Sequence, residues 1–257
     1  MKNSITQNKI KSKIVIALLW LAIWQLLYMV IDMEVLFVSP VGVLKTLCKL
    51  IQDGLFWQSV FMSFLRVTQG YIIAVVLGTV FAVITVVIPF AYDFFYPVIS
   101  LVKAAPVVSF IILTLVWLKS GTVPAFISFL MVFPVVWTNV SEGIRRTDKK
   151  LLEMAKIFDF GRIKTVKNIY IPSVLPFFKT ACVTGLSLAW KSGIAAEVIC
   201  TPKLSIGKQL YNSKIYLETP ELFAWTAVVV IMSVIVEKLF VAVINLVVDR
   251  YYLKRRC

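Results

Sequence analysis

Two charged side chains inside one long apolar stretch are the residues whose type and position could do chemistry. Lys191 lies near the middle of this stretch, directly after Trp190, and Glu197 follows towards its end. Ionisable groups are costly inside a bilayer and usually face a protein interior or a water path. Lys191, Glu197 and Trp190 are therefore candidate site residues: if this stretch crosses a bilayer, they would line a translocation path, where Lys191 would offer a positive charge to an anionic solute. The alternative is a structural ion pair of Lys191 with Glu197 or Glu237, across helices or across a dimer.

Other kinds of chemistry lack the residues that they need. The chain contains no His, the commonest metal ligand and the usual proton shuttle near neutral pH. Gly207-Lys208 lacks the glycine frame and the following Ser or Thr of a P-loop, so ATP binding of that kind is not expected. The cysteines are scattered without a CxxC pair, which predicts neither a zinc site nor a disulfide framework; they are Cys48, Cys182, Cys200 and Cys257. We predict no metal, no cofactor and no enzymatic activity.

The composition indicates a protein that is dissolved in a bilayer. The 257 residues are 60% hydrophobic and 16% charged, with a mean hydropathy of +0.90, whereas soluble domains are about half apolar and a quarter charged. Because about 20 apolar residues in a helix cross the hydrocarbon, we predict an all-α polytopic membrane protein with six transmembrane helices. Their expected ranges are 14–31, 67–88, 97–118, 123–138, 174–199 and 223–248. The first range lacks a small-residue cleavage site, which favours an uncleaved helix over a signal peptide.

The distribution of positive charge predicts the orientation. The net charge is +14, and most Lys and Arg residues outside the predicted spans collect before the first span, within 139–173 and at the C-terminus. Cytoplasmic loops of membrane proteins carry such an excess, so we expect both termini in the cytoplasm. This topology accounts for the net charge without a nucleic-acid partner.

Small residues recur every four positions in two of the predicted spans. Such stripes let helices approach closely in lipid, where packing replaces the hydrophobic drive. They predict tight helix contacts in a compact bundle or a dimer. The stripes are Gly70, Ala74, Gly78 and Ala82 in one span, and Ala181, Gly185, Ala189 and Gly193 in another.

A short amphipathic helix is expected between the first two spans. Ser39-Pro40 suits a helix start, and apolar residues follow at helical spacing. We expect this helix on the outer surface, with Gly54 as its stop.

The segment between the fourth and fifth spans has the pattern helix, turn, helix. Asp148 is a plausible N-cap for a helix over 151–158, and Gly161 offers the turn that ends it. A second amphipathic run leads to Pro172 at the membrane entry. A knob of this kind, basic and partly apolar, suits lipid headgroups or a groove on a cytosolic partner.

This segment resembles the EAA loop of the permease subunits of binding-protein-dependent ABC importers, a pattern written E-A-A-x3-G-x9-I-x-L-P. Glu153, Ala155 and Pro172 occur at matching offsets. The chain departs from the pattern at Met154, where Ala is usual, and at Asp159, where Gly is usual, with Gly161 two residues later. Outside the loop, LFVSPVGVLKTL and GLSLAWKSGIAAEVI look like the nitrate, sulfonate and taurine branch of this family.

The resemblance implies a MetI-like permease fold, with residues 1–257 as one permease domain, a core of about 60–250 and a coupling loop at 141–172. It implies a homodimer in the bacterial cytoplasmic membrane, two copies of an ATP-binding subunit and an extracytoplasmic substrate-binding protein. The coupling residues would be Glu153, Ala155, Lys156, Asp159, Gly161 and Pro172. The solute would be a small organic or inorganic anion or a vitamin precursor.

A secondary carrier or channel that needs no ATPase is the alternative function. Carriers often show inverted repeats and broken helices at the midplane. The two halves of this chain show no convincing repeat, and few acidic residues lie within the spans to couple protons or sodium.

Overall fold

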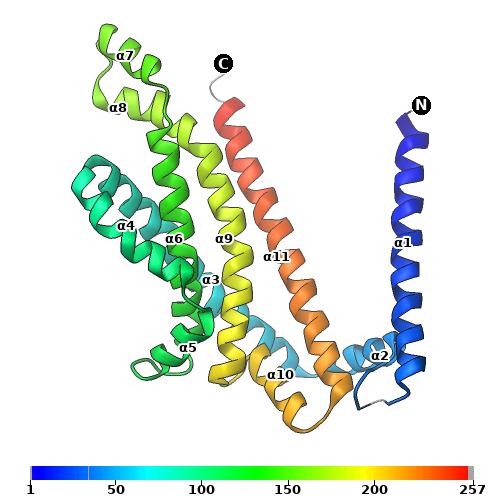
Figure 1. The fold of residues 1–257 in the computed structure, drawn as a ribbon. Coiled ribbons are helices and arrows are strands. Elements are labelled where there is room, and N and C mark those ends of the chain that lie inside the picture. The colour runs from blue at the N-terminus through cyan, green and yellow to red at the C-terminus, as the bar shows by residue number, and fades with distance from the viewer. Residues whose placement is uncertain (1, 34, 254–257) are drawn as a thin grey trace.

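The computed structural model describes the backbone of residues 2–33 and 35–253, which contain helices and no strand (Figure 1). The helices, in chain order, are α1 Lys2–Ile31, α2 Pro40–Leu50, α3 Gly54–Val87, α4 Pro89–Ala104, α5 Val107–Leu115, α6 Val123–Arg145, α7 Lys149–Ile157, α8 Arg162–Thr165, the π-helix η1 Val166–Tyr170, α9 Ile171–Cys200, α10 Ile206–Ile215 and α11 Thr219–Leu253. The all-α prediction is therefore confirmed for the described part of the chain.

Four helical segments in the described residues are long and apolar enough to cross a membrane. They are Gly54–Val87, Val123–Arg145, Arg162–Cys200 and Thr219–Ile244. A fifth span arises if α4 and α5 are counted together, although they are bent by 99°. The apolar part of α1, Leu18–Ile31, is shorter.

The prediction of one continuous helix over 97–118 is wrong. α4 ends at Ala104, and Ala105 is extended, with φ −76° and ψ 143°. Pro106 follows; its ring disfavours helical angles at the preceding residue. The chain therefore turns at Ala105 and restarts as α5, so the third predicted span is a broken one.

Side-chain caps decide where the next helices begin. Ser39 Oγ accepts a hydrogen bond from the Gly42 amide at 3.0 Å, and α2 runs from Pro40 as predicted. The prediction that Gly54 ends the short helix is wrong. Gly54 begins α3 instead, because the Asp53 carboxylate caps this helix by accepting a hydrogen bond from the Leu55 amide at 3.0 Å. α3 thus starts well before the span predicted from Val67.

The core lies where α6 packs against α3 and α9. The small-residue stripes lie at these contacts within the chain: a Cβ added at Gly70 would overlap the Ala125 carbonyl oxygen, and one at Gly185 would reach Val132 at 2.9 Å. Side chains also hydrogen-bond across the contacts, since Ser128 Oγ donates to the Ala189 carbonyl at 3.1 Å. Close backbone approach and interhelical hydrogen bonds therefore hold the three helices together.

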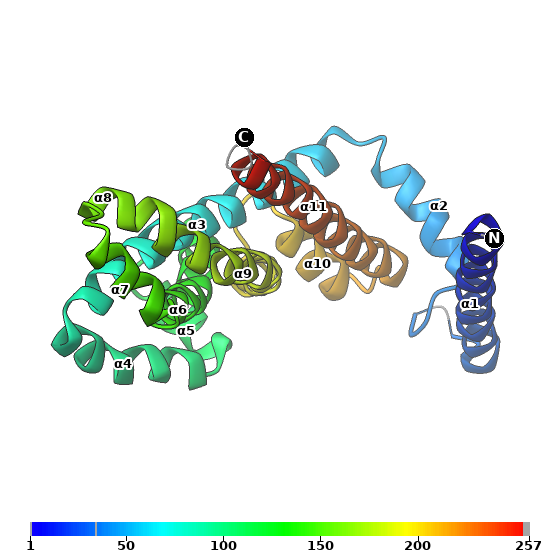
Figure 2. The ribbon, with the colours of Figure 1, turned by 90° about the horizontal axis from the view of Figure 1, so that it is seen from above.

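The helix ends sort to two sides of the bundle (Figure 1). α7, α8, the start of α1 and the end of α11 lie at one side, here named the α7 end. α2, α5 and α10 lie at the other side, the α10 end. Seen from above, α1 stands apart from α3, α6 and α9, and α2 connects it to them (Figure 2).

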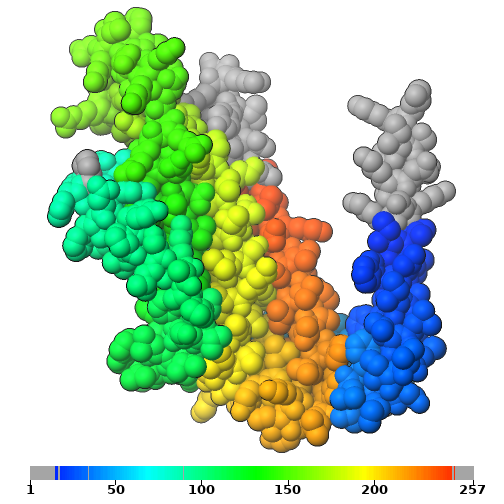
Figure 3. Space-filling view, viewed as in Figure 1, coloured from blue at the N-terminus to red at the C-terminus, as the bar shows by residue number. Residues whose placement is uncertain are grey.

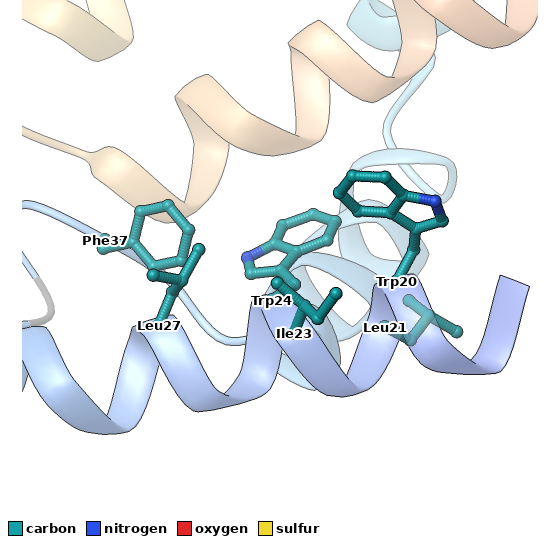
Figure 4. Close-up of a pocket in the computed structure, with 6 residues that line it drawn as sticks. All are labelled: Trp20, Leu21, Ile23, Trp24, Leu27 and Phe37. Atoms are coloured by element: carbon teal, nitrogen blue, oxygen red, sulfur yellow. The ribbon is translucent and has the colours of Figure 1, made fainter. Parts of the chain in front are cut away.

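α1 is attached near its last turns. The Trp24 indole N–H donates to the Val38 carbonyl at 3.0 Å, and the Trp24 ring lies 6.4 Å from that of Phe37 and 6.2 Å from that of Phe223. In the space-filling view an open gap separates α1 from α11 away from this attachment (Figure 3). Beside the attachment, Trp20, Trp24 and Phe37 line a shallow apolar groove (Figure 4).

Candidate functional site

α9 carries a polar face that points away from the core. At 100° per residue, Thr180, Thr184, Ser187 and Lys191 lie within about 60° of one another on the helix. Thr180, Thr184 and Lys191 are exposed, and Ser187 donates to the Glu237 carboxylate of α11 at 3.2 Å. The small-residue stripe of α9 lies on the other side of the helix, against α6. One spanning helix thus separates an apolar packing face from a polar outward face.

Lys191 is the charge on this polar face. Among the described residues no carboxylate lies within 4.0 Å of its ammonium group. The two acids considered as its partners are engaged elsewhere, Glu197 with Arg66 and Glu237 with Ser187. An ion pair within the described chain therefore does not account for the presence of a charged Lys191 in this spanning helix.

Trp190 and Glu197, which were expected beside Lys191 on a path, lie in the interior instead. The Trp190 indole N–H donates to the Val229 carbonyl of α11 at 3.1 Å. Glu197 has no exposed surface and pairs with Arg66 of α3 at 3.4 Å. Glu197 lies about 120° around the helix from Lys191, so the two cannot face the same space. Arg66 was not a predicted site residue, because only the fold brings it to Glu197.

The predicted helix–turn–helix is present at the α7 end. Asp148 caps α7 by accepting from the Lys150 amide at 2.9 Å. The helix closes with a Schellman turn: the Phe160 amide donates to the Ala155 carbonyl at 2.8 Å, and the Asp159 amide to the Lys156 carbonyl at 3.1 Å.

Asp159, rather than Gly161, supplies the left-handed residue of this turn. Its φ is 50°, a conformation that Asp adopts more readily than most residues. Gly161 has a φ of −58° and precedes α8. The expectation that Gly161 makes the turn is therefore wrong. Asp159 stands where the EAA pattern has Gly, and it is this position that takes the left-handed backbone angles which glycine adopts most easily.

α7 presents an apolar surface together with charges. Ala155 is buried, whereas Glu153 and Lys156 are exposed. Ile157 is 82% exposed and Phe158 is 69% exposed at the tip of the segment. Exposed apolar groups rimmed by charge are typical of surfaces that bind a partner.

The second half of this segment leads directly into α9. α8 and η1 continue into α9 without a break, so Pro172 lies inside a continuous helical stretch, where it cannot donate a backbone hydrogen bond. A π-helix is rare and often lies at functional sites.

Several apolar helices long enough to cross a membrane, with a helix–turn–helix segment at one end, define a polytopic membrane protein. Residues 74–253 match the family described as "Binding-protein-dependent transport system inner membrane component". The match covers more than half of the chain, so the chain belongs to this family. It is a multi-pass protein of the inner membrane.

Three relatives narrow the branch. The chain is similar to the bicarbonate transport system permease protein CmpB of Synechocystis sp. (27% identical over 63% of this chain and 58% of the relative). It is also similar to the taurine transport system permease protein TauC of Escherichia coli (23% identical; 72% and 67%). A third is the putative aliphatic sulfonates transport permease protein SsuC of Bacillus subtilis (23% identical; 79% and 74%). The chain spans 58% of the Synechocystis relative's length. The predicted resemblance to the nitrate, sulfonate and taurine branch is confirmed.

Proposed function

We propose that this chain is the membrane-spanning permease subunit of an ABC importer, which forms the translocation path for a small anion and couples it to ATP hydrolysis on a separate subunit. The observation that carries the proposal is the exposure of Ile157 and Phe158 at the C-terminal end of α7, at one end of the spanning helices (Figure 1). A surface that is costly to leave in water is expected to be covered by a partner. The family match makes an ATP-binding subunit the partner of choice.

In this proposal two permease copies each bind one ATP-binding subunit through the 141–172 segment. Glu153 and Lys156 flank the apolar tip and give the contact its polar rim. Asp159, Gly161 and Pro172 shape the segment rather than touch the partner. Ala155 is buried, so it is not part of the surface that α7 offers to the partner.

The polar face of α9 supplies the path. A Lys facing lipid near the middle of a span is costly, so Lys191 is expected to face water or a second copy of the chain. A homodimer that pairs the two polar faces would place two positive charges along one path. The relatives are named for bicarbonate, taurine and aliphatic sulfonates, which are anions or carry an acidic group. We infer a solute with an anionic group, delivered by a substrate-binding protein.

The helix directions support six crossings with both termini in the cytoplasm. The start of α1, the end of α11 and α7 lie together at the α7 end (Figure 1). α1 and the bent α4–α5 pair then complete the six spans, with the α7 end as the cytoplasmic one.

The test is reconstitution of the permease with its ATP-binding subunit and substrate-binding protein in vesicles. We expect uptake that requires ATP. Ile157→Ser should weaken binding of the ATP-binding subunit at least about tenfold, the loss of roughly 1.4 kcal/mol of apolar contact. Ile215→Ser is the matched control: it makes the same change at a residue 55% exposed on α10, at the opposite end. Full-rate uptake without the ATP-binding subunit would favour the carrier, and equal effects of both variants would refute the docking role of α7.

A further inference from the structure

A buried carboxylate joins three parts of the chain at the α10 end. Glu197 of α9 has no exposed surface. Its Oε2 accepts from Ser63 Oγ of α3 at 2.6 Å and from the Gly207 amide of α10 at 3.2 Å, and its Oε1 lies 3.4 Å from Arg66 Nη1. A buried charge is tolerated only when it is paired and hydrogen-bonded, and these three donors meet that need.

Arg66 extends the contacts to the connection between α9 and α10. Its Nη1 donates to the Leu204 carbonyl at 3.0 Å, and its Nη2 donates to the Lys203 carbonyl at 2.9 Å. Ser63 takes part twice, since its Oγ also accepts from the Ile206 amide at 2.9 Å. The planar guanidinium can bridge a carboxylate and two carbonyls at once, which an ammonium group cannot.

The connection needs such contacts because it is strained and tightly packed. Thr201 and Leu204 have left-handed φ values of 45° and 50°, which persist only where the surroundings fix them. Gly207 packs directly on α9, and a Cβ there would overlap Glu197. α10 therefore packs against the end of α9, with no room for a side chain at position 207.

The same contacts fix the rotation of α9 about its axis. Glu197 must point towards α3 to meet Ser63 and Arg66. Lys191 lies about 120° around the helix, so this setting turns it outwards, as observed.

We propose that Arg66 and Glu197 form a clamp that positions α9 for transport: it holds the ends of α3, α9 and α10 as one body and keeps Lys191 facing out of the chain. This inference rests on the proposed function, because the clamp acts on the path through Lys191. Arg66 and Glu197 are positioning residues and do not themselves meet the solute.

The test compares Glu197→Gln and Arg66→Lys in the reconstituted transport complex. Glu197→Gln keeps the volume but leaves Arg66 without its counter-charge, and Arg66→Lys keeps the charge but loses the bridging contacts. Glu218→Gln is the matched control, because Glu218 is exposed near the same end. Ser63→Ala is a milder variant that removes one donor to Glu197 and changes no charge.

Two measurements distinguish a clamp that positions α9 for transport from a contact that only stabilises the fold. The first is the distance distribution between spin labels at Gln69 of α3 and Lys214 of α10, both exposed, in a complex whose permease cysteines have been replaced. The second is the number of solute molecules transported per ATP hydrolysed. We expect both clamp variants to broaden the distribution and to lower the transport ratio about tenfold, Ser63→Ala to do so less, and Glu218→Gln to do neither.

Each outcome decides the proposal. A narrow distribution in both clamp variants shows that no clamp exists, and a broadened one with an unchanged transport ratio shows a structural tie without a positioning role. If Glu197→Gln does not assemble, Ser63→Ala and Arg66→Lys decide in its place. Absence of ATP-dependent uptake in the unaltered complex would refute the proposed function instead, while the distance measurement would still test the clamp.

Discussion

Gly70→Ala is expected to destabilise the fold by separating α3 from α6. The added Cβ would overlap the carbonyl oxygen and carbon of Ala125 and would meet Ser128 Cβ at 3.0 Å. A helix backbone cannot rotate out of the way as a side chain can, so the two helices must move apart. Overpacking of this kind costs about 3 kcal/mol at the upper end of its range. Alanine returns about 1 kcal/mol through helix propensity, which leaves a net loss of about 2 kcal/mol.

Two other glycines of the chain provide a graded comparison. At Gly193 the new Cβ would meet side-chain atoms, Ser128 Oγ and Val67 Cγ2, both at 2.6 Å. Val67 is buried and stiff at χ1, and Ser128 Oγ is bonded to the Ala189 carbonyl, so both can yield only in part. Gly193→Ala is therefore expected to cost about 2 kcal/mol before the propensity gain and about 1 kcal/mol overall. At Gly54 nothing lies within 4 Å, so Gly54→Ala should be neutral or slightly stabilising.

Thermal unfolding of the purified variants in one detergent measures this order. A net loss of about 2 kcal/mol corresponds to a midpoint about 4 to 8 °C lower for a chain of this size. Gly70→Ala should show that decrease, Gly193→Ala a smaller decrease and Gly54→Ala none or a slight increase. Equal midpoints for Gly70→Ala and Gly54→Ala would show that α3 and α6 do not approach as closely as the structure has them.

Three further changes test other parts of the fold and site. Asp159→Gly should raise the stability of the α7 segment by about 1 kcal/mol, since glycine adopts the left-handed angles without a side-chain penalty; slower proteolysis of this segment would show it, and faster proteolysis would contradict it. Lys191→Met should lower the rate or affinity of anion uptake at least about tenfold, whereas Lys191→Arg should retain most of it; uptake by Lys191→Met with unchanged rate and affinity would end the path role of this residue. Trp24→Phe loses the hydrogen bond to Val38, at about 1 kcal/mol, but keeps an aromatic ring beside Phe37 and Phe223, whereas Trp24→Ala loses both and should detach α1; hydrogen exchange of α1 residues measures the two variants, and equal exchange would refute the attachment.

Local signals in the sequence predicted much of the fold. Ser39 with Pro40, and Asp148, are caps whose hydrogen bonds close within three residues, so the sequence alone identifies them. The glycine at position 54 suggests a helix end, but the cap formed by the preceding Asp53 makes it the start of the next helix. A span predicted from apolar content alone passes through Pro106, because hydropathy does not register the break that the proline ring imposes on the preceding residue.

The long-range contacts of the site could not be predicted in this way. Arg66 and Glu197 are 131 residues apart in the chain, and no spacing rule connects them. Helical periodicity places Lys191 and Glu197 on different faces of α9, but which of these two faces is buried depends on the helices that pack against each. Lys191 and Glu197 therefore looked alike in the sequence, although one is exposed and the other has no exposed surface.

The contacts along α9 determine how a displacement at α7 could reach the path. The glycine contacts hold α9 against α6, and Arg66 and Glu197 tie its far end to α3 and α10. α9 is therefore not free to slide or rotate alone, because packed helices move between discrete arrangements rather than deform continuously. η1 is the stretch between α7 and α9 whose hydrogen bonding departs from the α-helix. A push on α7 must then either move α3, α6, α9 and α10 together, which carries Lys191 as a rigid part of one body, or be absorbed at η1 before it reaches the path.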